Sequence, residues 1–186
     1  MESIAGKLLV ASRELRDPNF TQSVVMMIEH SPEGALGVIL NHPSTTSVSE
    51  AWAQIDGGEL EDDTPVFVGG PVPGPLIALH AIEDLGEKEV LPGVFMSVQR
   101  DVIEKLVLAP DTRLRLYSGH SGWGAGQLED EMKAGGWHIV SAEPGDVFAD
   151  QEQTEDLWQY VLERMAIDIM LPGVPHNKLP RDPNMN

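Results

Sequence analysis

The chain has 186 residues, of which 41% are hydrophobic and 23% charged, a composition typical of a globular protein with a buried core. It carries 12 basic and 30 acidic residues, so its formal net charge is −18. Such a charge repels phosphate backbones, and we expect no direct nucleic-acid binding. The absence of cysteine excludes disulfides, thiolate catalysis and zinc sites built on cysteine.

No apolar run approaches the length of a membrane span. The start, Met1-Glu2-Ser3, lacks the basic residues that open a secretory signal. We therefore expect a cytoplasmic protein that does not act at a membrane.

The first elements are a short strand and a hairpin. Lys7–Ala11 is an apolar strand, and residues 17–20 contain the Asp, Pro and Asn of a turn. Residues 23–29 are almost continuously apolar, which is typical of a strand buried on both faces. A proline and a glycine then suit a tight turn, so residues 35–40 should return as the partner strand.

A helix is predicted next. Ser47 and Glu50 form a capping box, in which hydroxyl and carboxylate satisfy free N–H groups at a helix start. One apolar helical face follows, made of Val48, Ala51, Trp52 and Ile55. Gly57-Gly58 should end this helix.

Residues 65–69, 76–81 and 90–96 predict three further strands. Pro92-Gly93 marks a bulge, an edge or a break in the last of them. Residues 69–75, between the first two, are too rich in Gly and Pro for regular structure.

The second half predicts two longer helices and more short strands. Ser97 should cap a helix that ends at Leu108. Polar and apolar side chains alternate in residues 113–117, which predicts a strand with one solvent-exposed (wet) face. Residues 137–142 and 146–149 predict short strands. Thr154 should cap the longest helix, whose apolar stripe is Leu157, Trp158, Val161, Leu162, Met165 and Ile169.

Residues 119–131 are the most unusual stretch. Four glycines surround Trp123 in a predicted loop between a strand and an acidic helix. Glycines gathered in this way imply backbone angles or close approaches that a Cβ would forbid. Glu129 stands three residues after Gly126, where a capping-box carboxylate would be, which favours a self-capped structural helix.

Familiar catalytic motifs fail in this stretch. Gly119-His120-Ser121-Gly122-Trp123 is nearly a nucleophile elbow, but Trp123 occupies the final glycine position. Ala125 stands where a P-loop needs lysine, and Gln127 breaks the spacing of a dinucleotide-binding loop. We therefore assign no catalytic residue and no cofactor.

The six histidines show no spacing typical of metal ligands, so no metal site is predicted. His30, His80 and His120 each lie near the end of a predicted strand. The alternative to a binding protein is a hydrolase that combines one of them with a carboxylate such as Glu29 or Asp17.

Several segments occur in an order that is specific when taken together: Gly6-Lys7-Leu8-Leu9, Asp17-Pro18-Asn19-Phe20, Gly34-Ala35-Leu36-Gly37, Leu40-Asn41, Gly69-Gly70-Pro71-Val72 and Gly122-Trp123-Gly124-Ala125-Gly126-Gln127-Leu128-Glu129. On these segments the chain resembles the YqgE/AlgH family of bacterial proteins up to about Leu171. His42 replaces the arginine of the usual Asn-Arg-Pro, and Ala125 replaces a usual proline. The resemblance implies an α+β fold of coiled, partly split sheets. One branch of the family carries the label of a transcriptional regulator of alginate production.

The expected fold is thus α+β, with bent, mostly antiparallel sheets and about four helices in one domain over residues 1–171. Residues 172–186, with four prolines, should form a loose tail. We expect a non-enzymatic binding or regulatory module that acts through a protein or small-molecule partner. Its candidate site consists of Asn41, Gly69, Gly70, Pro71, His120, Ser121, Gly122, Trp123, Gly124 and Gln127.

Trp123 allows two interpretations. As an anchor, its indole would be buried against Gly70-Pro71 and would donate its N–H to a backbone carbonyl. As the wall of a site, the ring would stay partly exposed. We expect burial, because loop tryptophans in compact domains usually serve as anchors.

We predict that the protein does not bind duplex DNA specifically at physiological salt, because a net charge of −18 opposes the dominant phosphate contribution to affinity. Fluorescence anisotropy with labelled duplexes should give no saturable, sequence-dependent signal. A sequence-specific complex of nanomolar affinity would overturn this expectation.

Overall fold

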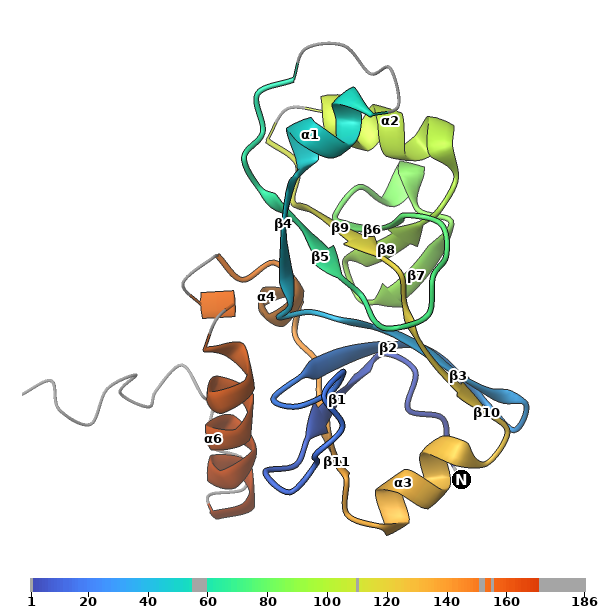
Figure 1. The fold of residues 1–186 in the computed structure, drawn as a ribbon, viewed down its shortest axis with the longest axis vertical. Coiled ribbons are helices and arrows are strands. Elements are labelled where there is room, and N and C mark those ends of the chain that lie inside the picture. Colours follow the sequence, from blue (N-terminus) through green and yellow to red (C-terminus); the bar gives the residue numbers. More distant parts are fainter. Residues whose placement is uncertain (1, 55–59, 110, 151–152, 155, 171–186) are drawn as a thin grey trace, which may run out of the picture.

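The computed structural model describes residues 2–54, 60–109, 111–150, 153–154 and 156–170. In these ranges the chain forms two sheets that face each other (Figure 1). The five-stranded sheet has the order β10-β3-β2-β1-β11, with β1 at Lys7–Ala11, β2 at Val24–Ser31, β3 at Gly34–Ile39, β10 at Ser121–Gly124 and β11 at Trp137–Ser141. The six-stranded sheet has the order β4-β5-β9-β6-β8-β7, with β4 at Pro43–Ser47, β5 at Pro65–Val68, β6 at Ile77–His80, β7 at Lys88–Leu91, β8 at Val94–Ser97 and β9 at Leu114–Ser118.

Neighbouring strands are antiparallel except β5 and β9, which run parallel. The helices are α1 at Val48–Ala53, α2 at Arg100–Leu108, α3 at Gln127–Lys133, α4 at Pro144–Val147 and α6 at Leu157–Met170, with a 3₁₀ turn at Glu83–Leu85. The predicted α+β class with mostly antiparallel sheets is confirmed. None of the helices in the described ranges is long and apolar enough to cross a bilayer.

Three apolar cores separate the layers. The first lies between the two sheets and includes Leu8, Val10, Met26, Leu79 and Tyr117. The second lies between the five-stranded sheet and α3 and includes Leu9, Val25, Met27, Trp123 and Leu128. The third lies between the six-stranded sheet and the pair α1 and α2 and includes Val48, Ala78, Ile103 and Leu116. Because successive strand residues point to opposite faces, the buried parts of β1 and β2, residues 8–11 and 24–28, must be apolar at every position to meet two cores.

The predicted hairpin and the first capping box are confirmed. Strands β2 and β3 pair through a two-residue connection, with Ser31 opposite Gly34. The Ser47 hydroxyl accepts the N–H of Glu50 at 3.2 Å, and the Glu50 carboxylate accepts the N–H of Ser47 at 2.9 Å. Helix α1 ends at Ala53. Ile55 and Gly57-Gly58, which the sequence assigns to the end of this helix, lie outside the described residues.

Residues 90–96 form part of a hairpin instead of one strand. Pro92-Gly93 makes the turn between β7 and β8, and Gly93 has a φ of 80°, which favours glycine. Ser97 is consequently the last residue of β8, so its predicted role as a helix cap is wrong. The cap position of α2 is held by Gln99, and the carboxylate of Glu87 accepts the N–H groups of residues 98 and 99, just before the helix, at 2.8 Å.

Two other strand predictions change. The expected wet face of residues 113–117 is wrong, because Leu116 and Tyr117 are both buried, one under the helices and one between the sheets. Residues 146–149 do not form a strand. Pro144 begins the short helix α4, where its missing N–H costs nothing.

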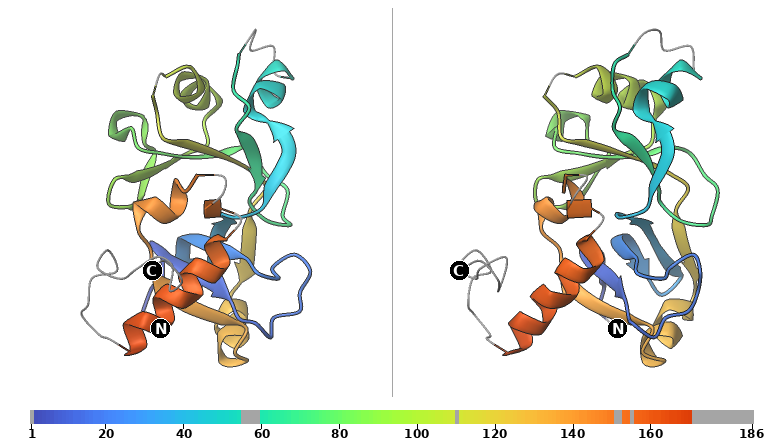
Figure 2. Two further views of the ribbon diagram at one scale, coloured as in Figure 1. Left: turned by 90° about the vertical axis from the view of Figure 1, so that its left-hand side faces the viewer. Right: turned by 60° about the vertical axis from the view of Figure 1, so that its left-hand side comes forward.

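Helix α6 lies across the side of the five-stranded sheet (Figure 2, left). Its residues Leu157, Val161 and Leu162 are buried, whereas Ile169, predicted in the same stripe, is 74% exposed. The helix begins at Leu157, and the hydroxyl of Thr154, the predicted cap, donates to the carbonyl of residue 150 at 2.7 Å.

A buried ion pair fixes α6. The guanidinium of Arg164 donates to both carboxylate oxygens of Asp146 in α4, at 2.7 and 2.9 Å. Arg164 also donates to the carbonyl of Ser141 at the end of β11, at 3.0 Å. Both charged side chains are at most 4% exposed, so each depends on the other for compensation.

We predict that Leu162→Ala lowers the free energy of unfolding by about 2–5 kcal/mol, because it removes a buried leucine from the core between the sheets. Ile169→Ala on the same helix is the matched control and should change it by less than about 0.5 kcal/mol, since that side chain is exposed. Urea denaturation of both variants measures the difference. Equal losses would show that the two positions do not differ in burial.

Candidate functional site

Two glycine-containing segments meet where the chain passes from the six-stranded to the five-stranded sheet. Gly69 follows β5 and donates its N–H to the carbonyl of Ser118, at the end of β9, at 2.9 Å. Val72 and His120 exchange a pair of backbone hydrogen bonds at 3.0 and 2.9 Å. The segments 69–72 and 118–121 are therefore joined backbone to backbone, and we call this contact the glycine joint.

No Cβ fits inside the glycine joint. A Cβ on Gly69 would lie 2.4 Å from the carbonyl oxygen of Gly119, and one on Gly70 would lie 2.3 Å from the carbonyl carbon of His120. Gly70 has a φ of 151° and Gly119 a φ of 71°, angles that side-chain-bearing residues rarely adopt. The expected close approach of glycine backbones is thus present between these segments.

Ser121 closes the glycine joint from the side of β10. Its hydroxyl donates to the carbonyl of Gly69 at 3.1 Å, and the N–H of Ile39 donates to the same oxygen at 2.9 Å. Ser121 is fully buried. Its proton is therefore committed to a backbone acceptor, which agrees with the rejection of the nucleophile elbow.

Trp123 lies in strand β10 and not in a loop, which corrects the predicted setting of this residue. Its burial is as expected, with 5% of the residue exposed. The indole does not pack on Gly70-Pro71. It stacks on Phe20 at 5.8 Å and meets Trp137 edge-on at 6.0 Å between ring centres.

The Trp123 indole N–H has a carboxylate as its acceptor and not the expected backbone carbonyl. Glu131 accepts this N–H at 3.0 Å and the indole N–H of Trp137 at 2.9 Å, both on one oxygen. Its other oxygen accepts the side-chain amide of Gln127 at 3.0 Å. The side-chain oxygen of Gln127 in turn accepts the backbone N–H of Gly124 at 3.1 Å. Glu131 thus ties β10, α3 and β11 together.

Asn41 lies apart from these residues. Its side-chain oxygen accepts the N–H of Val24 and its amide donates to the carbonyl of Gln22, each at 2.9 Å. It borders a polar pocket of about 460 Å³, where burial lowers the pKa of the neighbouring His42. The pocket is lined by Thr21, Gln22, Asn41, His42, Asp156, Trp158 and Gln159.

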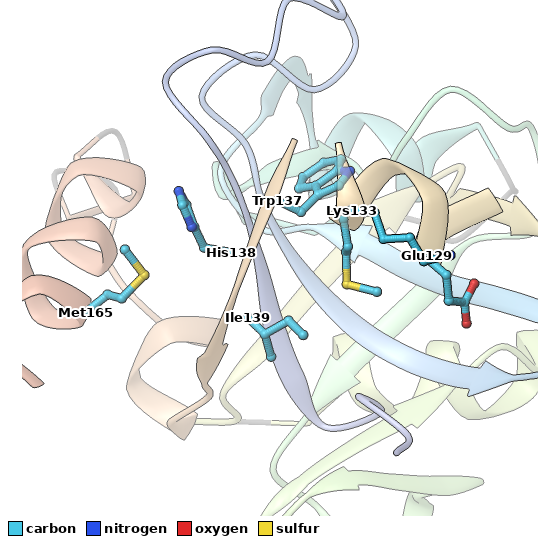
Figure 3. A pocket seen from close by; sticks show the side chains of 7 residues that line it. Glu129, Lys133, Trp137, His138, Ile139 and Met165 are labelled. Atoms are coloured by element: carbon cyan, nitrogen blue, oxygen red, sulfur yellow. The ribbon is translucent and has the colours of Figure 1, made fainter. Parts of the chain in front are cut away.

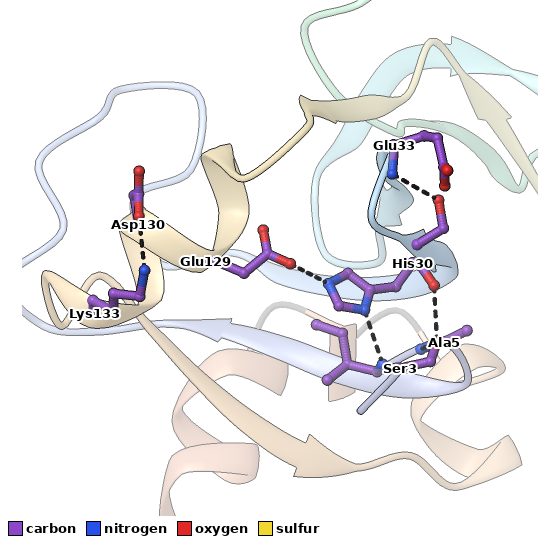
Figure 4. A network of polar contacts seen from close by, with 9 residues as sticks. Ser3, Ala5, His30, Glu33, Glu129, Asp130 and Lys133 are labelled. Atoms are coloured by element: carbon purple, nitrogen blue, oxygen red, sulfur yellow. Dashed lines mark hydrogen bonds and ion pairs between the residues drawn. The ribbon is translucent and has the colours of Figure 1, made fainter. Parts of the chain in front are cut away.

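His30 is part of a structural network shown in Figure 4. The N–H of Ile4 donates to Nδ1 at 3.4 Å, so Nε2 carries the proton and donates to Glu129 at 3.2 Å. Glu129 is therefore the partner of His30 and not a capping residue of its own helix. The neighbouring Glu29 pairs with Lys88 at 2.7 Å.

His80 is also committed at both nitrogens. The Ser97 hydroxyl donates to the carbonyl of Leu85 at 2.7 Å, so it accepts from Nε2–H of His80 at 3.0 Å. The N–H of Ile82 donates to Nδ1 at 3.3 Å. Burial lowers the pKa of His80 and keeps the ring neutral. Neither His80 nor His30 has a nitrogen available to activate water, and no metal-binding group of three or more His, Asp or Glu side chains occurs in the described part of the chain.

A groove of about 490 Å³ runs beside β11, between α3 and α6 (Figure 3). Trp137 points toward α3, His138 points toward α6, and Met165 faces them from α6 (Figure 3). Ile139 on the same strand is 42% exposed. The lining consists of Glu129, Met132, Lys133, Trp137, His138, Ile139 and Met165.

None of these lining residues belongs to the predicted site, although Gln127 lies on the same helix, α3. The sequence does contain a signal, because residues 137–141 form a strand without proline or a Lys, Arg, Asp or Glu side chain. β11 is the last strand of its sheet because it pairs with β1, about 130 residues earlier in the chain. The sequence near β11 does not reveal this pairing.

Comparison with known proteins places this geometry among relatives. The AlgH-like family model matches residues 8–170. A UPF0301 protein of Streptomyces avermitilis is 36% identical over 200 residues, covering 100% of this chain and 97% of that protein. A UPF0301 protein of Chlorobium luteolum is 41% identical over 161 residues, covering 83% and 82%. The solution structure of AlgH from Pseudomonas aeruginosa has a TM-score of 0.73 and 25% identity, covering 94% of this chain and 96% of that one.

We predict that Trp123→Ala lowers the free energy of unfolding by about 3–5 kcal/mol, the usual range for an aromatic residue truncated in a core. Trp123→Phe keeps a ring against Phe20 but removes the N–H donated to Glu131, so it should cost clearly less. Urea denaturation compares the two. A loss below about 1 kcal/mol for the alanine variant would contradict the anchor role.

Proposed function

Because the chain belongs to the AlgH-like family, we propose that it is a non-enzymatic, cytoplasmic binding module that regulates a protein partner through the groove beside β11. The observation that carries this proposal is the groove itself, which combines the apolar side chains of Met132, Ile139 and Met165 with an accessible strand. An exposed apolar surface of this kind is typical of a site for a macromolecular partner.

The glycine-tryptophan stretch supports this surface from behind. Trp123 and Gln127 hold Glu131, and Glu131 orients the indole of Trp137 on the groove wall. In this proposal Ser121, Gly122, Trp123, Gly124 and Gln127 are positioning residues of the binding site. The glycine joint, which includes Gly69, Gly70, Pro71 and His120, helps to fix the sheet that carries β11. Asn41, which lies apart from the joint, also helps to fix this sheet.

Any regulatory effect on transcription would pass through a protein partner. A chain with 12 basic and 30 acidic residues has an unfavourable field for a phosphate backbone. A basic partner gains from the same field in both encounter rate and affinity. This charge favours regulation by protein contact over direct contact with DNA.

A photo-crosslinking amino acid placed at Ile139 tests the proposal, with the same substitution at Leu108 as control. Leu108 is 62% exposed and lies on α2, at the opposite side of the molecule from α3 (Figure 1). Irradiation in cells that make the protein should give discrete crosslinked species from position 139 and none of these from position 108. The same products from both positions, or none from position 139, would contradict the groove as the binding surface.

A further inference from the structure

The edge of β11 differs from the other sheet edges. The devices by which the sequence of an edge strand protects it from pairing include proline, charged side chains and very short length. Strand β4 begins with Pro43, β7 carries Lys88 and Glu89, and β10 has only four residues, two of them glycine. The sequence of β11, Trp-His-Ile-Val-Ser, has none of these devices. Among the described residues β11 has a neighbouring strand on one side alone, β1, so its other edge is competent to pair.

The register shows which backbone groups of β11 are free of β1. Ser12 lies one step beyond β1 and donates its N–H to the carbonyl of Gly136 at 2.9 Å. In an antiparallel pair, hydrogen-bonded and non-hydrogen-bonded pairs alternate. His138 and Val140 therefore bond to β1 through their backbones. The N–H and C=O groups of Trp137 and Ile139 face the other way, into the groove that both residues line.

Arg164 confirms this direction and marks the end of the open edge. Ser141 follows Ile139 by two residues, so its carbonyl points to the same side. That carbonyl accepts the Arg164 guanidinium from α6 at 3.0 Å. Arg164 thus closes the edge of β11 at Ser141. At Trp137 and Ile139 the edge lies in the groove between α3 and α6 (Figure 3).

We propose that an extended, basic peptide segment of a partner protein adds to the five-stranded sheet as a sixth strand along β11, between α3 and α6. This inference rests on the proposed binding function and specifies its mode. The backbone of the peptide pairs with Trp137 and Ile139. One set of its alternate side chains packs on the apolar wall formed by Met132 and Ile139. The other set lies toward His138 of β11 and Met165 of α6.

Charge selects a basic occupant. The net charge of the chain is −18, and Glu129 of α3 lines the groove, with Asp130 next to it on the same helix. Lys133, the cation on the same wall, already pairs with Asp130 at 3.0 Å. A second copy of this chain would bring the same negative charge to the interface, so pairing of two β11 edges is opposed by repulsion.

The first test uses synthetic peptides of about eight residues, within the usual strand length, with alternating lysine and valine. Matched peptides carry glutamate in place of lysine. Two more lysine-valine peptides are N-methylated at either all lysine or all valine residues, which removes the N–H donors from one edge and leaves the charge unchanged. Binding is measured by titration, and its position by the amide NMR shifts of the protein.

We expect the lysine-valine peptide to bind and to shift the amides of Trp137 and Ile139 most. The glutamate peptide and one of the two N-methylated peptides should bind at least about tenfold more weakly, since one loses charge attraction and the other loses edge hydrogen bonds. Equal binding of both N-methylated peptides would show attraction by charge alone and would overturn strand addition. Equal or tighter binding of the glutamate peptide would overturn the basic occupant.

Ile139→Pro is the decisive variant. It removes an N–H that faces the groove and is not used by β1, the arrangement in which an edge strand accepts proline. Ile139→Val keeps the N–H and is the control. Peptide binding should fall at least about tenfold in the proline variant and persist in the valine variant. If the proline variant does not fold, the N-methylated peptides on the unchanged protein still decide the question.

Two outcomes separate this inference from the proposed function. Crosslinking from position 139 without any dependence on peptide N–H groups would leave the binding module in place and overturn strand addition. Sedimentation equilibrium that shows a dimer, dissociated by the proline variant, would assign the edge to a second copy and overturn the basic partner.

Discussion

Direct contact between two stretches of backbone holds the two sheets together. At the glycine joint, Gly69 and Gly70 lie against residues 119–121 with no room for a Cβ. The carbonyl of Gly69 accepts hydrogen bonds from both Ile39 and Ser121, so strands β3 and β10 of one sheet are bound to the end of β5 in the other. A side chain at these glycines would separate the sheets and open the core between them.

The carboxylate of Glu131 fixes the side chains around it, including those next to the groove beside β11. Glu131 accepts two indole N–H groups and one amide, which fixes Trp123, Trp137 and Gln127 relative to one another. A partly buried carboxylate with three donors is well compensated, and the aromatic rings around it are held in one packing arrangement. The groove beside β11 therefore has a wall fixed by hydrogen bonds, which would lower the entropy lost in the proposed binding of a partner.

The polar side chains that suggest chemistry serve the fold instead. His30 joins the N-terminal segment to α3 through Glu129, and His80 joins two strands to the turn before β7 through Ser97. Arg164 and Asp146 compensate each other under α6. These groups are engaged within the fold, and we therefore assign the proposed contact with a partner to the edge of β11 and its apolar walls.

Local sequence determined the elements whose cause lies within a few residues. The apolar runs of β1 and β2, the turn between β2 and β3, and the capping box of Ser47 and Glu50 all follow from neighbouring side chains and backbone angles. The fold class follows from their order. The four glycines between residues 119 and 126 also indicate, from sequence alone, backbone angles or close approaches that a Cβ would forbid.

Tertiary structure decided the partners and the edges. His30 meets Glu129 across 99 residues of sequence, and the Trp158 indole meets the carbonyl of Ala11 across 147. Leu116 and Tyr117 are buried on opposite faces because helices cover one side of their sheet and the other sheet covers the second. The groove exists because β11 pairs with β1 and leaves its other edge between α3 and α6. Long-range pairing places these residues together, and no local pattern encodes which strand will be last in its sheet.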